Sequence, residues 1–167
     1  MIFVTIGMND APWNGLFFRM DDYAARTGEE VIMQVGNTGF EGKHTECFKF
    51  GTNDSMKEIY DRADMIVCHA GLGTILNALE RNIPVVMIPR VVVVPELTRD
   101  QQGAVAEKVE KIGRGVVVND LDDVFDGIEK ARALKFPPYK RDDSLVKFLI
   151  ELLAEIDAGH MKTDKRR

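Results

Sequence analysis

Residues 63–89 constrain the fold of this chain more than any other stretch, because they join two short apolar runs through a glycine-rich turn and a helical segment. Residues 65–68 have the length and β-branched content of a buried strand, and residues 83–88 repeat that pattern one helix later. The pattern predicts a strand-helix-strand unit. Free backbone N–H groups in the turn at residues 69–74, between the first strand and the helix, can meet an anionic ligand.

The rest of the chain repeats this alternation of apolar runs and helical periodicity. It predicts an α/β fold, a Rossmann-like parallel sheet with helices on both faces. Asn53 or Ser55 is expected to cap one of the helices. Ligands bind such sheets outside the carboxyl ends of the strands, where Gly7, Gly36 and the turn at 69–74 would lie. Further strands are expected at 2–6, 30–35, 47–50 and 115–118, and helices at 16–26, 55–62, 100–112, 120–134 and 142–157.

Length and composition set the domain count and the class of partner. The 167 residues, 45% of them hydrophobic, fit one domain at 1–158, followed by a flexible polar tail at 159–167. A formal charge of -5 argues against a general nucleic-acid surface. Cys47 and Cys68 lie in no CxxC or Cys/His cluster, so both are expected to be buried, reduced thiols. No leader pattern and no apolar run of about 18 residues are present, and we expect a cytoplasmic chain.

The turn at 69–74 is the strongest candidate site. A helix that begins at Gly71, Leu72, Gly73 and Thr74 offers unpaired N–H donors and a partial positive charge, which suit a phosphate or diphosphate. The turn lacks the GxGxxG and P-loop patterns, so its glycines could equally serve only to make a tight turn. His69 could contact a ligand, orient the loop, or be an ordinary buried histidine, and from the residues alone the last interpretation is favoured.

Amide side chains near the ends of two predicted helices are weaker candidates. Asn77 lies one turn into the helix after the glycine turn, and its amide could bind a sugar hydroxyl. Asp100 could cap a later helix, and the amides of Gln101 and Gln102 could bind sugar hydroxyls in the same way. Taken singly, each of these residues is more typical of a cap or a solvated surface. The sequence shows no Ser-His-Asp arrangement, no paired carboxylates and no metal-ligand spacing.

An ordered set of motifs resembles the glycosyltransferase family 28 C-terminal domain, the donor-binding half of the GT-B glycosyltransferases. In particular it resembles the single-domain members, such as the catalytic subunit of the dolichol-linked UDP-GlcNAc transferase and the small exopolysaccharide glycosyltransferase subunits. The likeness covers roughly residues 1–118. The motifs are FVTIG at 3–7, MQVG at 33–36, AD at 63–64 before HAGLGT at 69–74, and DQQ at 100–102.

The resemblance implies a UDP-sugar donor whose diphosphate lies at the N-terminus of the helix after the HAG turn, with no bound metal or other cofactor required. Two positions depart from the family pattern. Asn77 stands where many relatives have a glutamate that contacts ribose, and Gln101 stands where many have histidine. We assign His69 as the candidate catalytic residue, and as candidate substrate-binding residues Gly7, Gly36, Gly71, Leu72, Gly73, Thr74, Asn77, Asp100, Gln101 and Gln102.

A GT-B enzyme needs a second domain, which the resemblance places on a membrane-anchored subunit that holds a lipid-linked acceptor. The chain is then the donor-binding subunit of a two-component inverting enzyme for a UDP-N-acetylhexosamine and a polyprenyl-linked acceptor, cytoplasmic and peripheral at the membrane through its partner. Residues 91–94 and the helix at 145–156 are candidate partner contacts. Two alternatives are a non-catalytic nucleotide-sugar-binding or regulatory module, and a homo-oligomeric enzyme with a soluble acceptor.

Overall fold

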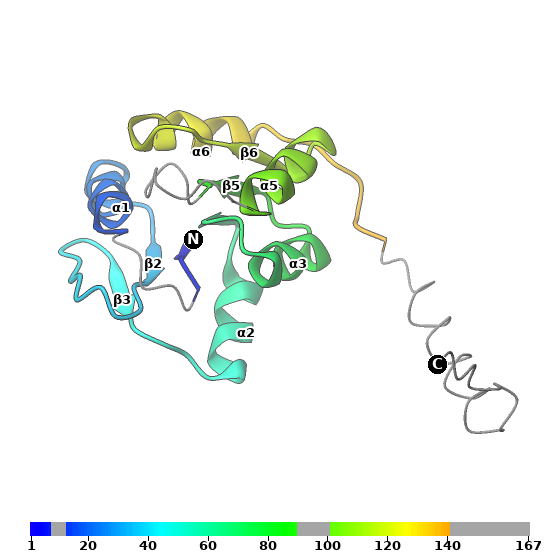
Figure 1. Cartoon of the computed structure of the whole chain (residues 1–167). Coiled ribbons are helices and arrows are strands. Elements are labelled where there is room, and N and C mark those ends of the chain that lie inside the picture. Colours follow the sequence, from blue (N-terminus) through cyan, green and yellow to red (C-terminus); the bar gives the residue numbers. More distant parts are fainter. Residues whose placement is uncertain (8–12, 90–100, 141–167) are drawn as a thin grey trace, which may run out of the picture.

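A single parallel sheet organises the protein. The computed structural model describes residues 1–7, 13–89 and 101–140, without the side chain of Gln101, and these residues include a six-stranded sheet in the order β3-β2-β1-β4-β5-β6 (Figure 1). Every pair of neighbouring strands is parallel. The strands are β1 (Ile2–Thr5), β2 (Val31–Gln34), β3 (Glu46–Phe48), β4 (Met65–Cys68), β5 (Val85–Met87) and β6 (Gly115–Val117).

Burial on both faces explains why the central strands are continuous apolar runs. All residues of β1, β2 and β4 are buried, as expected for parallel strands that helices cover on each side. In the sheet register, Thr5 at the end of β1 lies beside Gln34 of β2 and Cys68 of β4. The strand order reverses between β1 and β4, and crevices at such a switch point are where open α/β sheets bind ligands.

The helices cover the sheet in two groups (Figure 1). Side chains of α1 and α6 pack into the core on one face, with Trp13 among them, and side chains of α2, α3 and α5 pack into the core on the other face. Two of these helices end at a residue whose backbone is in the left-handed conformation, Gly28 after α1 and Asn82 after α3. The helices are α1 (Asn14–Thr27), α2 (Asn53–Arg62), α3 (Leu72–Arg81), α5 (Gln101–Lys111), the 3-10 turn η1 (Leu121–Asp123) and α6 (Val124–Arg132).

The buried guanidinium of Arg114 fixes the chain after α6 at the amino edge of the sheet. It stacks over the rings of Phe136, 4.8 Å from the centroid, and Tyr139, 5.6 Å from the centroid. It also donates hydrogen bonds to Asn82 Oδ1, at 3.3 Å, and to the carbonyl of Pro137. The same Asn82 oxygen accepts from the Tyr139 backbone N–H at 2.6 Å. The described chain therefore leaves the domain on the edge opposite to the carboxyl ends of the strands.

Several local predictions were wrong in detail. Thr52, rather than Asn53 or Ser55, caps α2, because its extended backbone lets its side chain accept from the Ser55 N–H. The helix expected at 120–134 begins as a 3-10 turn, where the Asp120 carboxylate accepts from the Asp122 N–H, and continues as α6. Cys47 is half-buried because β3 is an edge strand, and β3 spans 46–48 instead of 47–50.

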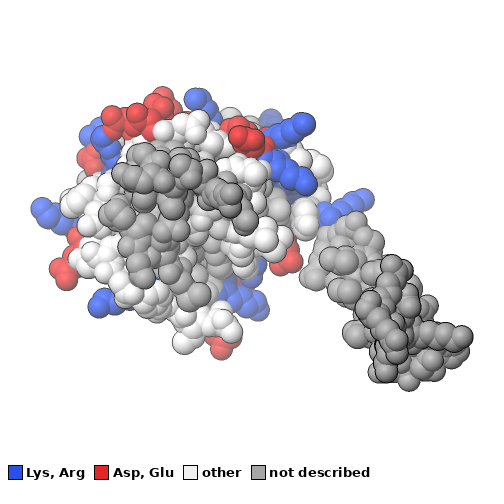
Figure 2. All heavy atoms as spheres, in the orientation of Figure 1, with Lys and Arg blue, Asp and Glu red and all other residues white. Residues whose placement is uncertain are grey.

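Some predictions fall outside the described residues. They concern Asp100, the apolar run at 91–94, the helix at 142–157 and the tail at 159–167. Within the described ranges, no helix is both long and apolar enough to cross a bilayer. Acidic and basic side chains are interspersed around the face shown in Figure 2, and the described residues form no continuous basic stripe in that view.

Candidate functional site

The carboxyl edge of the sheet holds a cavity of about 320 Å³ at the switch point. The ends of β1 and β2, one side of α2, and the turn between β4 and α3 form its walls. Five of the predicted site residues meet there. The lining residues are Thr5, Gly7, Gln34, Met56, Tyr60, His69, Gly71, Gly73 and Thr74.

Two glycines make room for the imidazole of His69, which is 9% exposed. A Cβ atom on Gly71 would lie only 2.6 Å from His69 Nε2, and one on Gly7 would lie 3.2 Å from His69 Cε1. Gly7 also has a φ of +64°, in the left-handed region that favours glycine. Trp13, fully buried, meets the imidazole edge-on with ring centroids 6.2 Å apart. The glycines therefore have a packing role around His69, in addition to any role in ligand approach.

The N-terminus of α3 opens on the same cavity. Gly71 is the N-cap, in extended conformation, and within the described chain no side chain caps this helix. The Ile75 N–H donates to the Gly71 carbonyl at 3.0 Å, so the N–H groups of Leu72, Gly73 and Thr74 precede the first intrahelical bond. A Cβ atom on Gly73 would have no heavy atom within 4 Å. Open space therefore lies beside Gly73, in the first turn of a helix whose N-terminus carries partial positive charge.

The backbone of the turn is under strain at Ala70. This buried residue has a φ of 62°, and non-glycine residues in that region cost on the order of 1 kcal/mol or more. Burial raises the pKa of the Cys68 thiol to about 12, and a backbone hydrogen bond with Ala70 opposes the shift only partly. Cys68 is therefore a protonated core residue near neutral pH and is no nucleophile.

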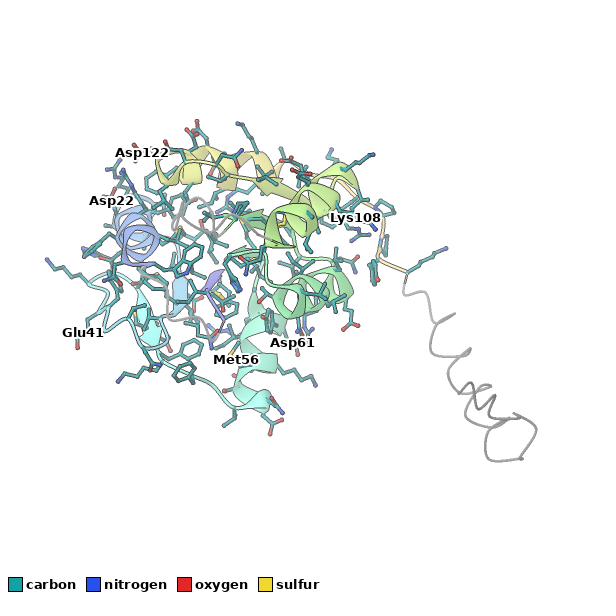
Figure 3. The ribbon with its side chains drawn as sticks, in the orientation of Figure 1. Asp22, Glu41, Met56, Asp61, Lys108 and Asp122 are labelled. Atoms are coloured by element: carbon teal, nitrogen blue, oxygen red, sulfur yellow. The ribbon has the colours of Figure 1, made fainter. Side chains whose placement is uncertain are left out.

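Four lining residues were not assigned to the site from the sequence, namely Thr5, Gln34, Met56 and Tyr60, although Thr5 and Gln34 lie within the FVTIG and MQVG motifs. Thr5 and Gln34 each end an otherwise apolar strand, and this polar ending was the available signal. Met56 and Tyr60 come from one side of α2 (Met56 is labelled in Figure 3). Burial raises the pKa of the Tyr60 phenol, and a hydrogen bond with the Thr74 side chain opposes this shift. The phenol is therefore a neutral hydroxyl near neutral pH.

Asn77 is engaged within its own helix and does not line this cavity. Its Nδ2 donates to the Gly73 carbonyl at 2.9 Å, and its Oδ1 accepts from Arg81 Nη1 at 3.0 Å. Arg81 in turn donates to Asp61 Oδ1 at 2.7 Å and lies over the Tyr60 ring, 5.5 Å from the centroid. The Asn77 side chain is thus oriented by α3 directly and by α2 through Arg81.

The remaining predicted residues that the structure describes lie elsewhere on the carboxyl edge. Gly36 lines a separate cavity of about 300 Å³ beside β3, together with Phe40 and Cys47. Leu72 is 60% exposed, at the start of α3. Gln102 is half-buried near the start of α5, where the next residue, Gly103, lines a third cavity of about 500 Å³. Gln101 begins α5, and Asp100 lies outside the described residues.

The described lining combines the apolar side chain of Met56 with polar groups that can bind a polar or anionic ligand. They offer hydroxyl, amide, imidazole and backbone N–H groups, and no lysine, arginine or carboxylate is among them. Among the described residues, no group of three or more His, Cys, Asp or Glu side chains could hold a metal ion. Such an arrangement can hold an anion through a helix end and neutral donors.

A family model described as the glycosyltransferase family 28 C-terminal domain matches residues 1–135. The chain belongs to this family. Over 88 residues it is 34% identical to a Mus musculus protein named UDP-N-acetylglucosamine transferase subunit ALG13. That alignment covers 50% of this chain but only 7% of the mouse protein.

Solved structures share the fold. The calicheamicin glycosyltransferase CalG4 matches 79% of this chain with a TM-score of 0.64 and 19% identity, and the match covers 34% of CalG4. A Methanocaldococcus jannaschii UDP-GlcNAc 2-epimerase, solved with UDP-GlcNAc and UDP, matches 92% of this chain with a TM-score of 0.64 and 11% identity, over 45% of its own length. The predicted fold class, a Rossmann-like sheet equivalent to one half of a GT-B glycosyltransferase, is confirmed.

Proposed function

We propose that this chain is the donor-binding and catalytic subunit of a two-component, inverting UDP-sugar glycosyltransferase. The donor is a UDP-N-acetylhexosamine and the acceptor is polyprenyl-linked, so the enzyme is a hexosyltransferase that needs a partner. Membership of the family 28 C-terminal domain supports the glycosyltransferase class. The likeness to a mouse protein named a UDP-N-acetylglucosamine transferase subunit supports the donor and the subunit character.

The observation that carries this proposal is the free N-terminus of α3. Its first N–H groups face a cavity at the switch point of the sheet, and the space around Gly73 is open. A diphosphate there would accept hydrogen bonds from the helix end and lie along its dipole. The neutral hydroxyls of Thr74 and Tyr60 line the same cavity and could add further donors.

The proposed reaction is a direct displacement at the anomeric carbon. The oxygen of an acceptor hydroxyl attacks that carbon and gives its proton to a base that we propose to lie on the partner subunit. The bond from the carbon to the β-phosphate oxygen breaks, and UDP leaves with the bonding electrons. The N-terminus of α3 would stabilise the negative charge that grows on the leaving diphosphate. His69 lines the cavity and is proposed to contact the donor. We propose that no metal or other cofactor is required, because the N-terminus of α3 would stabilise the negative charge of the diphosphate.

The partner is proposed to be a membrane-anchored subunit that binds the lipid-linked acceptor, which makes this chain cytoplasmic and peripheral at the membrane. A single Rossmann-like unit supplies only one wall of a GT-B site. Leu72, 60% exposed, and Leu76, 44% exposed, lie one helical turn apart on α3 and could contribute to the contact. Residues 91–94 and 145–156, the other candidate contacts, lie outside the described residues.

Calorimetric titration with UDP, UDP-GlcNAc, UDP-GalNAc, UDP-glucose and UDP-glucuronate tests the proposal. We expect UDP and a UDP-N-acetylhexosamine to bind, and Gly73→Val to weaken both by at least about tenfold, because its side chain fills the open space at the helix end. Leu76→Val is the matched control, since it places the same β-branched residue at an exposed position of the same helix. If no uridine nucleotide bound, or if Gly73→Val bound as well as the control, the proposal would fail.

One observation favours a second candidate, a non-catalytic nucleotide-sugar-binding or regulatory module. Asn77 stands where many relatives have glutamate, and its amide is held by Gly73 and Arg81. A module of this kind would bind UDP tightly but transfer no sugar. Sugar transfer to a polyprenyl-linked acceptor, measured after co-expression with candidate membrane subunits, separates the two functions.

A further inference from the structure

Two neighbouring strands end in polar side chains that lie side by side. Thr5 is the last residue of β1 and pairs in register with Gln34, the last residue of β2. Both are buried, with Thr5 1% and Gln34 7% exposed, although the other residues of these strands are apolar. Both also line the cavity at the switch point. Buried polar side chains of this kind need hydrogen-bond partners.

The hydrogen bonds around Thr5 determine which end of the Gln34 amide faces the cavity. The Gly7 backbone N–H donates to Thr5 Oγ1 at 3.0 Å. The Thr5 hydroxyl donates in turn to Gln34 Oε1 at 2.6 Å. Because the oxygen end of the amide is engaged, the Nε2 group, which carries two N–H donors, is the end left toward the cavity. Among the described residues, the hydrogen bond given for the Gln34 amide is made by Oε1, and the Gln34 side chain lines the cavity.

We propose that the Gln34 side-chain amide donates a hydrogen bond to an oxygen of the bound nucleotide sugar, on its phosphates or its sugar, and that Thr5 positions it. This inference rests on the proposed function. A chain of donors runs from the Gly7 N–H through the Thr5 hydroxyl to the Gln34 amide, and each bond polarises the next. An apolar residue would fill this strand position without the cost of a buried amide, which is about 1–3 kcal/mol when its donors are unsatisfied.

The primary test compares Gln34→Glu with wild type by titration with UMP, UDP and UDP-GlcNAc at mildly alkaline pH. Glutamate keeps an oxygen to accept from Thr5 but replaces the donor group by a second oxygen. We expect the affinity to fall by about tenfold or more for the ligand that the amide contacts. Asn53→Asp adds the same charge at the exposed start of α2, outside the cavity lining, and should change affinity less than about twofold.

The pattern across the three ligands identifies the oxygen. A loss confined to UDP-GlcNAc places the contact on the sugar, and a loss with UDP and UDP-GlcNAc places it on the β-phosphate. An equal loss with all three places it on the part that they share, and an unchanged affinity of both Gln34 variants for uridine then assigns it to the α-phosphate. Gln34→Met removes the donor without adding charge and should reproduce the pattern with a smaller loss.

A second pair of variants tests the positioning role of Thr5. Thr5→Val keeps the shape of the side chain but removes the hydroxyl, and it should weaken the same ligand by about fivefold. Thr5→Ser restores the hydroxyl and should recover most of the affinity, which a purely packing role would not predict. If wild type binds UDP-GlcNAc, Gly73→Val weakens binding by at least about tenfold, and both Gln34 variants bind as wild type does, then this inference is wrong while the proposed function stands. If wild type binds no uridine nucleotide, both fail.

Discussion

At the residue scale, Gly71 and Gly73 look alike in the sequence but differ in what surrounds them. Gly71 lies against the His69 imidazole, and a Cβ there would lie 2.6 Å from Nε2. Gly73 faces open space, with no heavy atom within 4 Å of a Cβ. One glycine is therefore required by the packing of the folded chain, whereas the other leaves space that a ligand can use.

This difference predicts opposite effects of the same substitution on stability. Gly71→Ala should lower the free energy of unfolding by about 1–3 kcal/mol, because the imidazole must move. Gly73→Ala should leave it unchanged or raise it by up to about 1 kcal/mol, because alanine favours the helix and contacts nothing. Urea unfolding of both variants without ligand checks this. Equal destabilisation by the two substitutions would contradict the packing described around His69.

At the element scale, one ion pair joins the end of α6 to the turn before β2. Arg132, the last residue of α6, donates to the Glu29 carboxylate and, at 3.3 Å, to the Tyr23 hydroxyl. The hydrogen bond from Arg132 lowers the pKa of Glu29, although partial burial opposes the shift. The ionised form of Glu29 is therefore favoured by folding, which links the position of α6 to pH.

The sign of this shift predicts the pH dependence. Because the pKa of Glu29 is lower in the folded state, its contribution to stability is present above its ordinary pKa of 4.5 and is lost as pH falls through the folded value. Glu29→Gln should cost on the order of 1 kcal/mol near neutral pH and progressively less below about pH 4. Glu129→Gln is the control. Glu129 Oε1 lies 3.6 Å from Arg132 Nε, and the Glu129 side chain is 67% exposed. A pH-independent difference between wild type and Glu29→Gln would contradict the linkage.

Whether a feature of the site could be predicted from the sequence depends on how far apart along the chain its interacting residues lie. Periodicity within single elements was enough for the strand 65–68, the glycine turn and the parallel sheet. The Thr5 and Gln34 pair was not predicted, because it joins residues 29 positions apart and depends on the sheet register. Gly36 was predicted at the carboxyl edge of the sheet as part of the same site, but it lines another cavity, beside the edge strand β3. Similarly, the contact of Arg81 with Asn77 and Asp61 depends on how α2 and α3 pack.

At the scale of the whole molecule, the two edges of the sheet have different roles. The carboxyl edge carries the cavity and the open end of α3. The amino edge carries the cluster of Arg114, Asn82 and Tyr139, next to the last described residue, 140. The Arg114 cluster is thus separated from the candidate site by the length of the strands, and substitutions in it should affect stability without altering the cavity.

The absence of lysine and arginine from the described cavity lining has a consequence for how ligand binding responds to ionic strength. Dipoles and neutral donors release few counterions when they bind an anion, and the net charge of -5 supplies no overall attraction for one. The dissociation constant for UDP should therefore rise less than about threefold as salt increases to about 0.5 M. Calorimetric titration across that range checks this, and a tenfold rise would mean that a cation outside the described lining holds the phosphates. A site of this kind keeps its affinity in concentrated electrolyte, where sites built on lysine and arginine weaken.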